Sequence, residues 1–122
     1  MKIKTSKDFI DKYEDFAILL YGFDEDANYP ERDDEYTIVN FAKFNSSTQI
    51  KRTIAQCKEI LNLNAFPYKW IGNIANRSLC VMKRISPEAN INLSDPDEQR
   101  YHKWVIWMVR RLEEEAKKQG KL

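Results

Sequence analysis

Residues 94–120, "SDPDEQRYHKWVIWMVRRLEEEAKKQG", give the clearest structural signal in this 122-residue chain. Asp95 is a favourable N-cap, Pro96 suits a first helical position and Gly120 suits a helix end. The apolar residues between them recur at helical spacing and are Tyr101, Trp104, Val105, Met108, Leu112 and Ala116. This segment therefore predicts one long helix whose apolar face packs against the rest of the chain.

Trp107 lies off that apolar stripe, within the run "WVIWMV" at 104–109. It allows two interpretations. The helix is buried on most of its sides, or Trp107 forms an exposed patch that anchors a partner. We favour the buried central helix. The run is also far too short to span a bilayer, so no membrane segment is expected.

Four further segments predict helices. Thr5 and Asp8 form a capping box that starts the first, and Gly22 is its expected end. Residues 34–44, "DEYTIVNFAKF", fit a helix or a strand, and we favour a helix because no second strand is evident to pair with it.

The remaining two helices are predicted from capping residues and from residues that end a helix. Ser46 and Gln49 form a second box, and Asn62 is the expected end of that helix. Pro67 suits the first turn of the next, whose apolar stripe runs to Ile85. Gly72 interrupts this stripe, and the close approach of another helix is the simplest reason for it.

These elements predict an all-α fold: a single-domain bundle of about five helices over 1–122, with a short acidic loop between helices 1 and 2. Residues 1–4 and 120–122 are expected to fray. The chain is long enough for one core, and 43% of its residues are hydrophobic. Cys57 and Cys80 fall in apolar-periodic segments, which indicates buried free thiols. With no apolar run behind the first lysines, we expect no signal peptide and a cytoplasmic protein.

The acidic loop is the unusual feature of the chain. Residues 21–36, "YGFDEDANYPERDDEY", contain seven carboxylates and one arginine. Asp24, Asp26, Asn28 and Glu35 match calcium-ligand positions of an EF-hand loop. The match fails elsewhere, because Tyr29 replaces the required glycine, Arg32 stands at a ligand position and Glu31 at an apolar one. We expect no metal site here.

Catalysis is not expected either. The only histidine, His102, lies in the last predicted helix, and no base is placed beside a nucleophile. Three scattered glycines form no phosphate-binding loop, and two cysteines with one distant histidine do not make a zinc site. We therefore expect no enzyme activity and no cofactor.

The basic residues of 45–93 suggest nucleic-acid binding as an alternative. They are Lys51, Arg52, Lys58, Lys69, Arg77, Lys83 and Arg84. Tyr68 and Trp70 flank Lys69, so a base-stacking patch is conceivable. The chain's pI of about 7.7 is well below that of a dedicated nucleic-acid binder. We expect solvated helix faces and no nucleic-acid partner.

Three segments resemble the immunity proteins of contact-dependent growth inhibition systems. They are "YGFDEDA", "AQCKEILNLNAFPYKWIGNIANRSL" and "RYHKWVIWMVRRLEEE", in order over about residues 6–117. The resemblance implies a cytoplasmic protein that binds the C-terminal toxin domain of a surface-delivered protein, one to one, and blocks it in the producing cell. Many of these toxins are nucleases. No functional residue is transferred from the family.

Charge alone places the expected partner-binding site. Nuclease active sites are basic, so an acidic inhibitor surface would replace the phosphates and speed association. The predicted residues are Asp24, Glu25, Asp26, Tyr29, Glu31, Asp33, Asp34 and Glu35, with Tyr36 as a further aromatic candidate. The alternative function is another small inhibitor or adaptor, such as a phage anti-defence protein.

Overall fold

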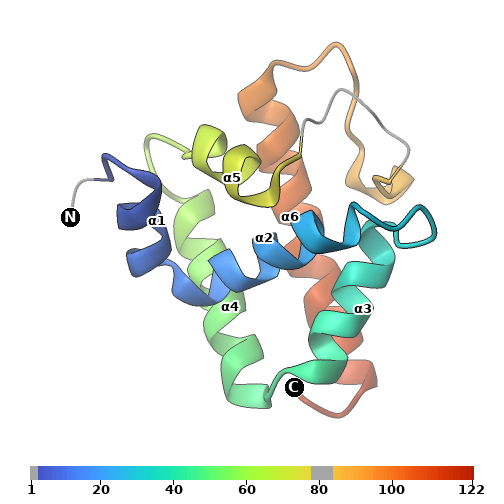
Figure 1. Cartoon of the computed structure of the whole chain (residues 1–122). Helices are drawn as coiled ribbons and strands as arrows, with labels where there is room; N and C mark the ends of the chain where they lie inside the picture. The colour runs from blue at the N-terminus through green and yellow to red at the C-terminus, as the bar shows by residue number, and fades with distance from the viewer. Residues whose placement is uncertain (1–2, 78–83) are drawn as a thin grey trace.

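The computed structural model describes residues 3–77 and 84–122, and in these ranges every regular element is helical. The elements are α1 (Ser6–Lys12), α2 (Glu14–Asp26), α3 (Asp34–Phe44), α4 (Ser47–Leu61), α5 (Tyr68–Ala75), the 3-10 helix η1 (Pro87–Ala89) and α6 (Asp97–Lys118). The all-α prediction is confirmed (Figure 1). The described ranges contain six α-helices where about five were predicted, because the first predicted helix is two helices.

The chain breaks between α1 and α2 at Tyr13, which has φ −122° and ψ 52°. The capping box of Thr5 and Asp8 forms as predicted. No side chain of its own caps α2. Instead, Gln56 of α4 accepts a hydrogen bond of 3.0 Å from the free N–H of Phe16. A residue 40 positions away thus satisfies the first turn of α2, which local sequence could not indicate.

Gly22 was wrongly predicted to end the first helix, since α2 continues to Asp26. The extra turn places Phe23 in the core, with its ring 4.9 Å from that of Trp104. A Cβ atom at Gly22 would lie 3.5 Å from Thr37 of α3, so this residue lies where α2 and α3 meet. The acidic loop therefore follows α2 and joins it to α3.

Both middle helices begin with a side-chain cap, of which the one at Ser46 was predicted. Asp33 caps α3, which confirms helix over strand, and Ser46 caps α4. The next helix is shorter than expected: α5 ends at Ala75 before Asn76, whose φ is +50°. The prediction for 78–83, including Cys80, lies outside the described residues, and Ile85 is not helical.

The long C-terminal helix α6 starts at Asp97 with Pro96 as its N-cap. The prediction that Asp95 caps it is wrong. The Asp95 carboxylate instead accepts from the N–H of Asn92 at 3.1 Å and from Lys103 at 2.9 Å. Trp107 is only 1% exposed, so the buried-helix interpretation is confirmed and the exposed-tryptophan patch is wrong.

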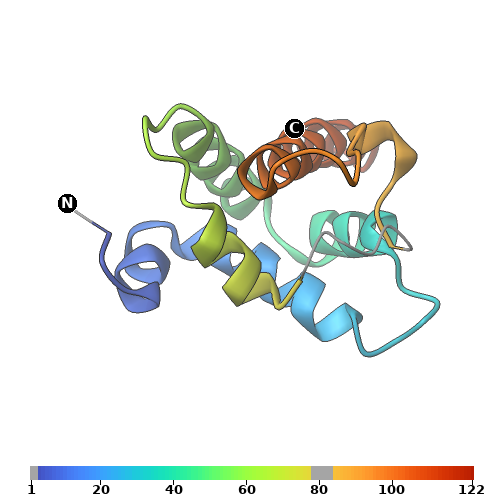
Figure 2. The ribbon, with the colours of Figure 1, turned by 90° about the horizontal axis from the view of Figure 1, so that it is seen from above.

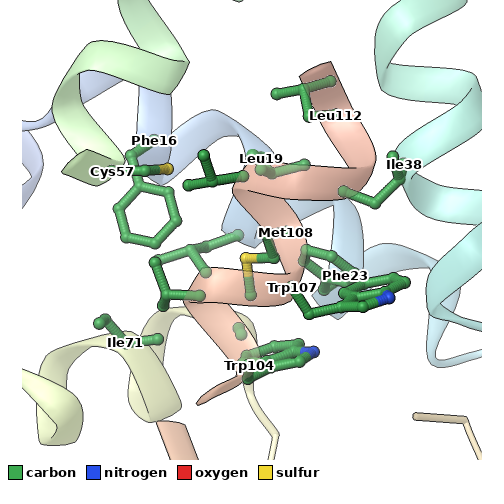
Figure 3. Close-up of a cluster of buried hydrophobic side chains, with 14 of the residues drawn as sticks. Phe16, Leu19, Phe23, Ile38, Cys57, Ile71, Trp104, Trp107, Met108 and Leu112 are labelled. Carbon is green, nitrogen blue, oxygen red and sulfur yellow. The ribbon is translucent and has the colours of Figure 1, made fainter. Parts of the chain in front are cut away.

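One apolar core receives side chains from every α-helix. Phe16, Leu19 and Phe23 of α2 and Trp104 and Met108 of α6 belong to this cluster (Figure 3). Seen from above, α4 and α6 lie side by side (Figure 2). Within the described ranges, no helix has both the length and the apolar character needed to cross a bilayer.

Gly72 has the role expected for it, since a Cβ there would lie 2.8 Å from the Tyr101 hydroxyl of α6. At the other end of α6, Lys121 lies in the segment expected to fray. Its ammonium donates to the carbonyls of Ala42, Lys43 and Asn45 at 2.6, 2.7 and 2.8 Å. It thereby satisfies the free carbonyls at the C-terminal end of α3.

Candidate functional site

The acidic stretch spans a helix end, a loop and a helix start. Asp24, Glu25 and Asp26 form the last turn of α2, and Asp34 and Glu35 the first turn of α3. The connecting loop, 27–33, lies at the end of the molecule away from the N-terminus (Figures 1 and 2). Five of the seven acids are thus held on two helices, and Glu31 and Asp33 lie in the loop between them.

Arg84 holds the main chain of this loop. Its guanidinium donates to the carbonyls of Asp26, Ala27, Tyr29 and Arg32 at 3.3, 3.0, 3.0 and 2.6 Å. The carbonyl of Arg84 in turn accepts from the N–H of Asp34 at 3.0 Å. Because one guanidinium binds four carbonyls, the loop has a defined shape although it contains no glycine.

Two of the predicted contact residues are structural. Asp34 is 0% exposed, with Arg77 at 2.8 Å and the indole N–H of Trp104 at 3.0 Å. Burial raises the pKa of Asp34, and the nearby Arg77 charge opposes that rise. Asp26 is 9% exposed and accepts from the Thr37 hydroxyl at 2.7 Å. In this conformation neither carboxylate presents a surface to a partner.

Two more predicted residues are partly used within the fold. Asp33 caps α3 by accepting from the N–H of Tyr36 at 2.9 Å, although it remains exposed. Glu35 receives a bidentate guanidinium from Arg111, whose Nε lies 2.7 Å from its carboxylate. These hydrogen bonds raise the pKa of Arg111. Both carboxylates keep negative charge near the surface, but they also stabilise α3.

Of the remaining predicted residues, Glu25, Tyr29 and Glu31 are exposed and Asp24 is half-buried. The carboxylates of Asp24, Glu25 and Glu31 make no hydrogen bond or ion pair with any residue that the structure describes. Tyr29 is 44% exposed, and the guanidinium of Arg32 lies 3.9 Å from its ring centre. This stacking holds the Tyr29 ring against the side chain of Arg32.

Sequence reasoning missed a partly apolar groove that Glu25 lines. Ile18 and Tyr21 of α2 and Phe44 of α3 are 41%, 47% and 75% exposed. They line a hollow of about 430 Å³ together with Glu25 and Arg32. The signal was available, because Ile18 and Tyr21 lie off the apolar stripe of their helix. We call this surface the acidic face; its members are Ile18, Tyr21, Asp24, Glu25, Tyr29, Glu31 and Phe44.

The basic residues considered for nucleic-acid binding are largely paired within the fold. Arg77 pairs with Asp34, and Arg84 binds loop carbonyls. Arg52 lies 3.1 Å from Asp15, and Lys58 lies 3.6 Å from Glu113. Lys51 and Lys69 have no ion-pair partner in the ranges described, and Lys83 lies outside them. Three of these residues therefore neutralise carboxylates of the fold, and Arg84 holds loop carbonyls.

The residues weighed for chemistry are placed as follows. His102 packs edge-on against Phe66, with ring centres 5.0 Å apart. Cys57 is a buried free thiol, as predicted, and burial raises its pKa far above the usual range. Over residues 3–77 and 84–122, no three His, Cys, Asp or Glu side chains are arranged to hold a metal ion.

Comparisons with protein-family models, with curated proteins and with solved structures find no match to this chain.

Proposed function

We propose that this chain is an inhibitory binding protein of the immunity type, which docks a basic toxin domain on its acidic face. One observation carries the proposal. Of the seven large apolar side chains that are exposed in the described ranges, Ile18, Tyr21 and Phe44 line one hollow, and Tyr29 stacks on Arg32, which lines the same hollow. The unpaired Glu25 lines this hollow, and the unpaired Asp24 and Glu31 belong to the same helix end and the loop that follows it.

This combination matches the needs of a protein interface. Exposed aromatic side chains supply most of the binding energy when a partner buries them. Carboxylates around them attract a cationic partner and raise its association rate. A nuclease that binds phosphates presents such a cationic site, so the acidic face would take the place of its substrate.

The function is tested by co-expression with the toxin domain encoded by the adjacent gene. We expect the two chains to copurify as a one-to-one complex and the producing cell to survive toxin expression. If this chain neither copurifies with the toxin domain nor protects the cell, the proposal is refuted.

The acidic face is tested by charge reversal of Glu25→Lys with Glu31→Lys. We expect association with the toxin domain to slow by about tenfold or more at low salt, with a smaller effect at high salt. The matched control is Glu59→Lys with Glu98→Lys, two exposed acids on other helices. Equal effects from both pairs would refute the site. Asp26 and Asp34 are avoided because their reversal would disturb the fold.

The apolar part of the face is tested by Phe44→Ser. The toxin domain would bury Phe44 in the complex, so replacing this side chain by Ser should speed dissociation of the complex by about tenfold or more. Ile106→Ser is the control, because Ile106 is also exposed, at 47%, but lies on α6. An unchanged dissociation rate for Phe44→Ser would remove the groove from the interface.

A further inference from the structure

A groove between α4 and α6 forms a second surface, which shares no residue with the groove of the acidic face. The two helices lie side by side (Figure 2), and the hollow between them measures about 470 Å³. Leu61 of α4 and Ile106 and Val109 of α6 form its apolar part. Ile106 is one of the large apolar side chains that stay exposed to solvent. This side of the molecule therefore presents an apolar helix residue that the fold does not cover.

Four of the residues that line this groove follow the spacing of a seam between two helices. Ile106, Arg110, Glu113 and Lys117 of α6 are separated by four, three and four positions. This spacing keeps side chains on one face of a helix, and it is the repeat by which helices pair in coiled coils. The face is three turns long, about 16 Å. A second helix can therefore lie along it.

The order of charges along this face indicates which helix that is. Arg110 and Glu113 stand at equal distances from the middle of the face, with opposite charges. If two copies of α6 run antiparallel about a twofold axis at that point, Arg110 of each copy faces Glu113 of the other. The aliphatic stem of Lys117 then covers Ile106. A parallel arrangement would instead place like charges opposite one another, which is unfavourable.

The contacts that these two charges make within the chain leave them available. Arg110 lies 3.3 Å from Glu88, and both side chains are exposed. Glu113 lies 3.6 Å from the exposed Lys58. Exposed ion pairs contribute little free energy, so exchanging them costs little. Three cations and two acids line the groove, so it does not select a strongly charged partner such as a nucleic acid. A second copy brings the same mixture of charges and is the better fit.

We propose that this chain pairs with a second copy of itself along α6, as a weak antiparallel dimer. The face is only three turns long, so it buries less surface than a standard protein interface, and we expect a dissociation constant in the submillimolar range. The inference goes beyond the proposed inhibitory function and does not depend on it, because the acidic face belongs to α2, α3 and the loop between them.

The test is analytical ultracentrifugation of the full chain up to millimolar concentration. We expect the average mass to rise with concentration toward that of two chains. Arg110→Glu and Glu113→Arg should each weaken pairing by about tenfold or more, because each puts like charges opposite one another at two symmetry-related contacts. Lys118→Glu is the control and should pair as the wild type does, because Lys118 is an exposed cation of α6 outside the groove.

Mixing the two variants tests the antiparallel arrangement itself. A chain with Arg110→Glu opposite a chain with Glu113→Arg has both attractive contacts again, with the charges exchanged. We therefore expect the mixture to pair about as tightly as the wild type, at a concentration where neither variant pairs with itself. A variant that had merely lost stability would not recover in this way, so the mixture separates pairing from folding.

Three results would overturn the proposal. They are an average mass of one chain up to millimolar concentration, equal effects of Arg110→Glu and Lys118→Glu, and a mixture of the two variants that stays monomeric. None of them bears on toxin binding, which is measured through Glu25 and Glu31 at concentrations too low for two copies to pair.

Discussion

Replacing Arg77 by Met should destabilise the protein strongly and in a pH-dependent way. The Arg77 side chain is 9% exposed, and its guanidinium lies 2.8 Å from the fully buried carboxylate of Asp34. Met keeps an apolar stem for packing against Phe23 and Trp104, whose ring centres lie 5.9 and 5.4 Å from the guanidinium. The main loss is therefore the positive charge beside Asp34.

The size of the stability loss depends on how the buried Asp34 carboxylate responds to the loss of the Arg77 charge. Removing one partner of a buried ion pair costs about 3–5 kcal/mol. Protonation of Asp34 sets an upper limit on this cost. If Asp34 is protonated in the folded variant at pH 7 and has a pKa of about 3.9 when unfolded, the cost is at most about 4 kcal/mol. Burial already raises the pKa of Asp34 in the wild type, so we expect a loss of about 3 kcal/mol.

The sign of the pH dependence is set by the raised pKa. An acid whose folded pKa exceeds its unfolded value contributes full stability below the unfolded pKa and loses it as pH rises through the folded pKa. Without Arg77 the folded pKa of Asp34 rises further, because the Arg77 charge is the strongest influence that lowers it. The deficit of Arg77→Met should therefore shrink from pH 7 to pH 5, by up to about 2.7 kcal/mol.

Urea unfolding at pH 5, 6 and 7 measures this, with the slope checked for two-state behaviour. Arg110→Met is the control, because Arg110 pairs with Glu88 at an exposed position and should cost less than about 1 kcal/mol at every pH. Adding Asp34→Asn to Arg77→Met removes the buried charge and should recover most of the loss. A deficit below about 1 kcal/mol at pH 7 that does not change with pH would refute the reasoning.

Three further predictions concern groups that close the fold. Arg84→Met should leave the helices intact but speed amide hydrogen exchange in 27–33 by about tenfold, since four carbonyls lose their donor; unchanged exchange would show that Arg84 does not hold the loop. Lys121→Met should lower the free energy of unfolding by about 1–3 kcal/mol, with the exposed Lys118→Met as control, because three carbonyls of α3 lose a charged donor. Gly72→Ala should lower the melting temperature despite the better helix propensity of Ala, because the new methyl would displace the Tyr101 hydroxyl from its 2.6 Å bond to the carbonyl of Arg77; a higher melting temperature would contradict this.

Much of the helical structure could be predicted because helix starts are local. Thr5, Asp33 and Ser46 each accept from an N–H three residues later, within one turn of the chain. The apolar stripe of α6 likewise follows from 3.6-residue periodicity. Predictions failed where a local signal was overruled by packing, as at Gly22, where continuing the helix buries Phe23.

The candidate site could be predicted only as a region. Counting charges indicated the acidic stretch, and Glu25, Tyr29 and Glu31 are indeed exposed. A count of charges could not distinguish these exposed residues from Asp34, which also carries a carboxylate but is fully buried. Nor could it indicate Phe44, whose exposure depends on how α2 and α3 pack together.

The sequence by itself determined that this chain is helical, where most of its helices begin, and that one segment concentrates negative charge. Those properties depend on neighbours within a turn or two. Only the tertiary structure decided which charges stay free. Trp104 reaches Asp34 from 70 residues away, and Arg84 reaches the loop carbonyls from more than 50. Burial and pairing depend on such long-range contacts, and among the described residues they leave the charges of Asp24, Glu25 and Glu31 unpaired.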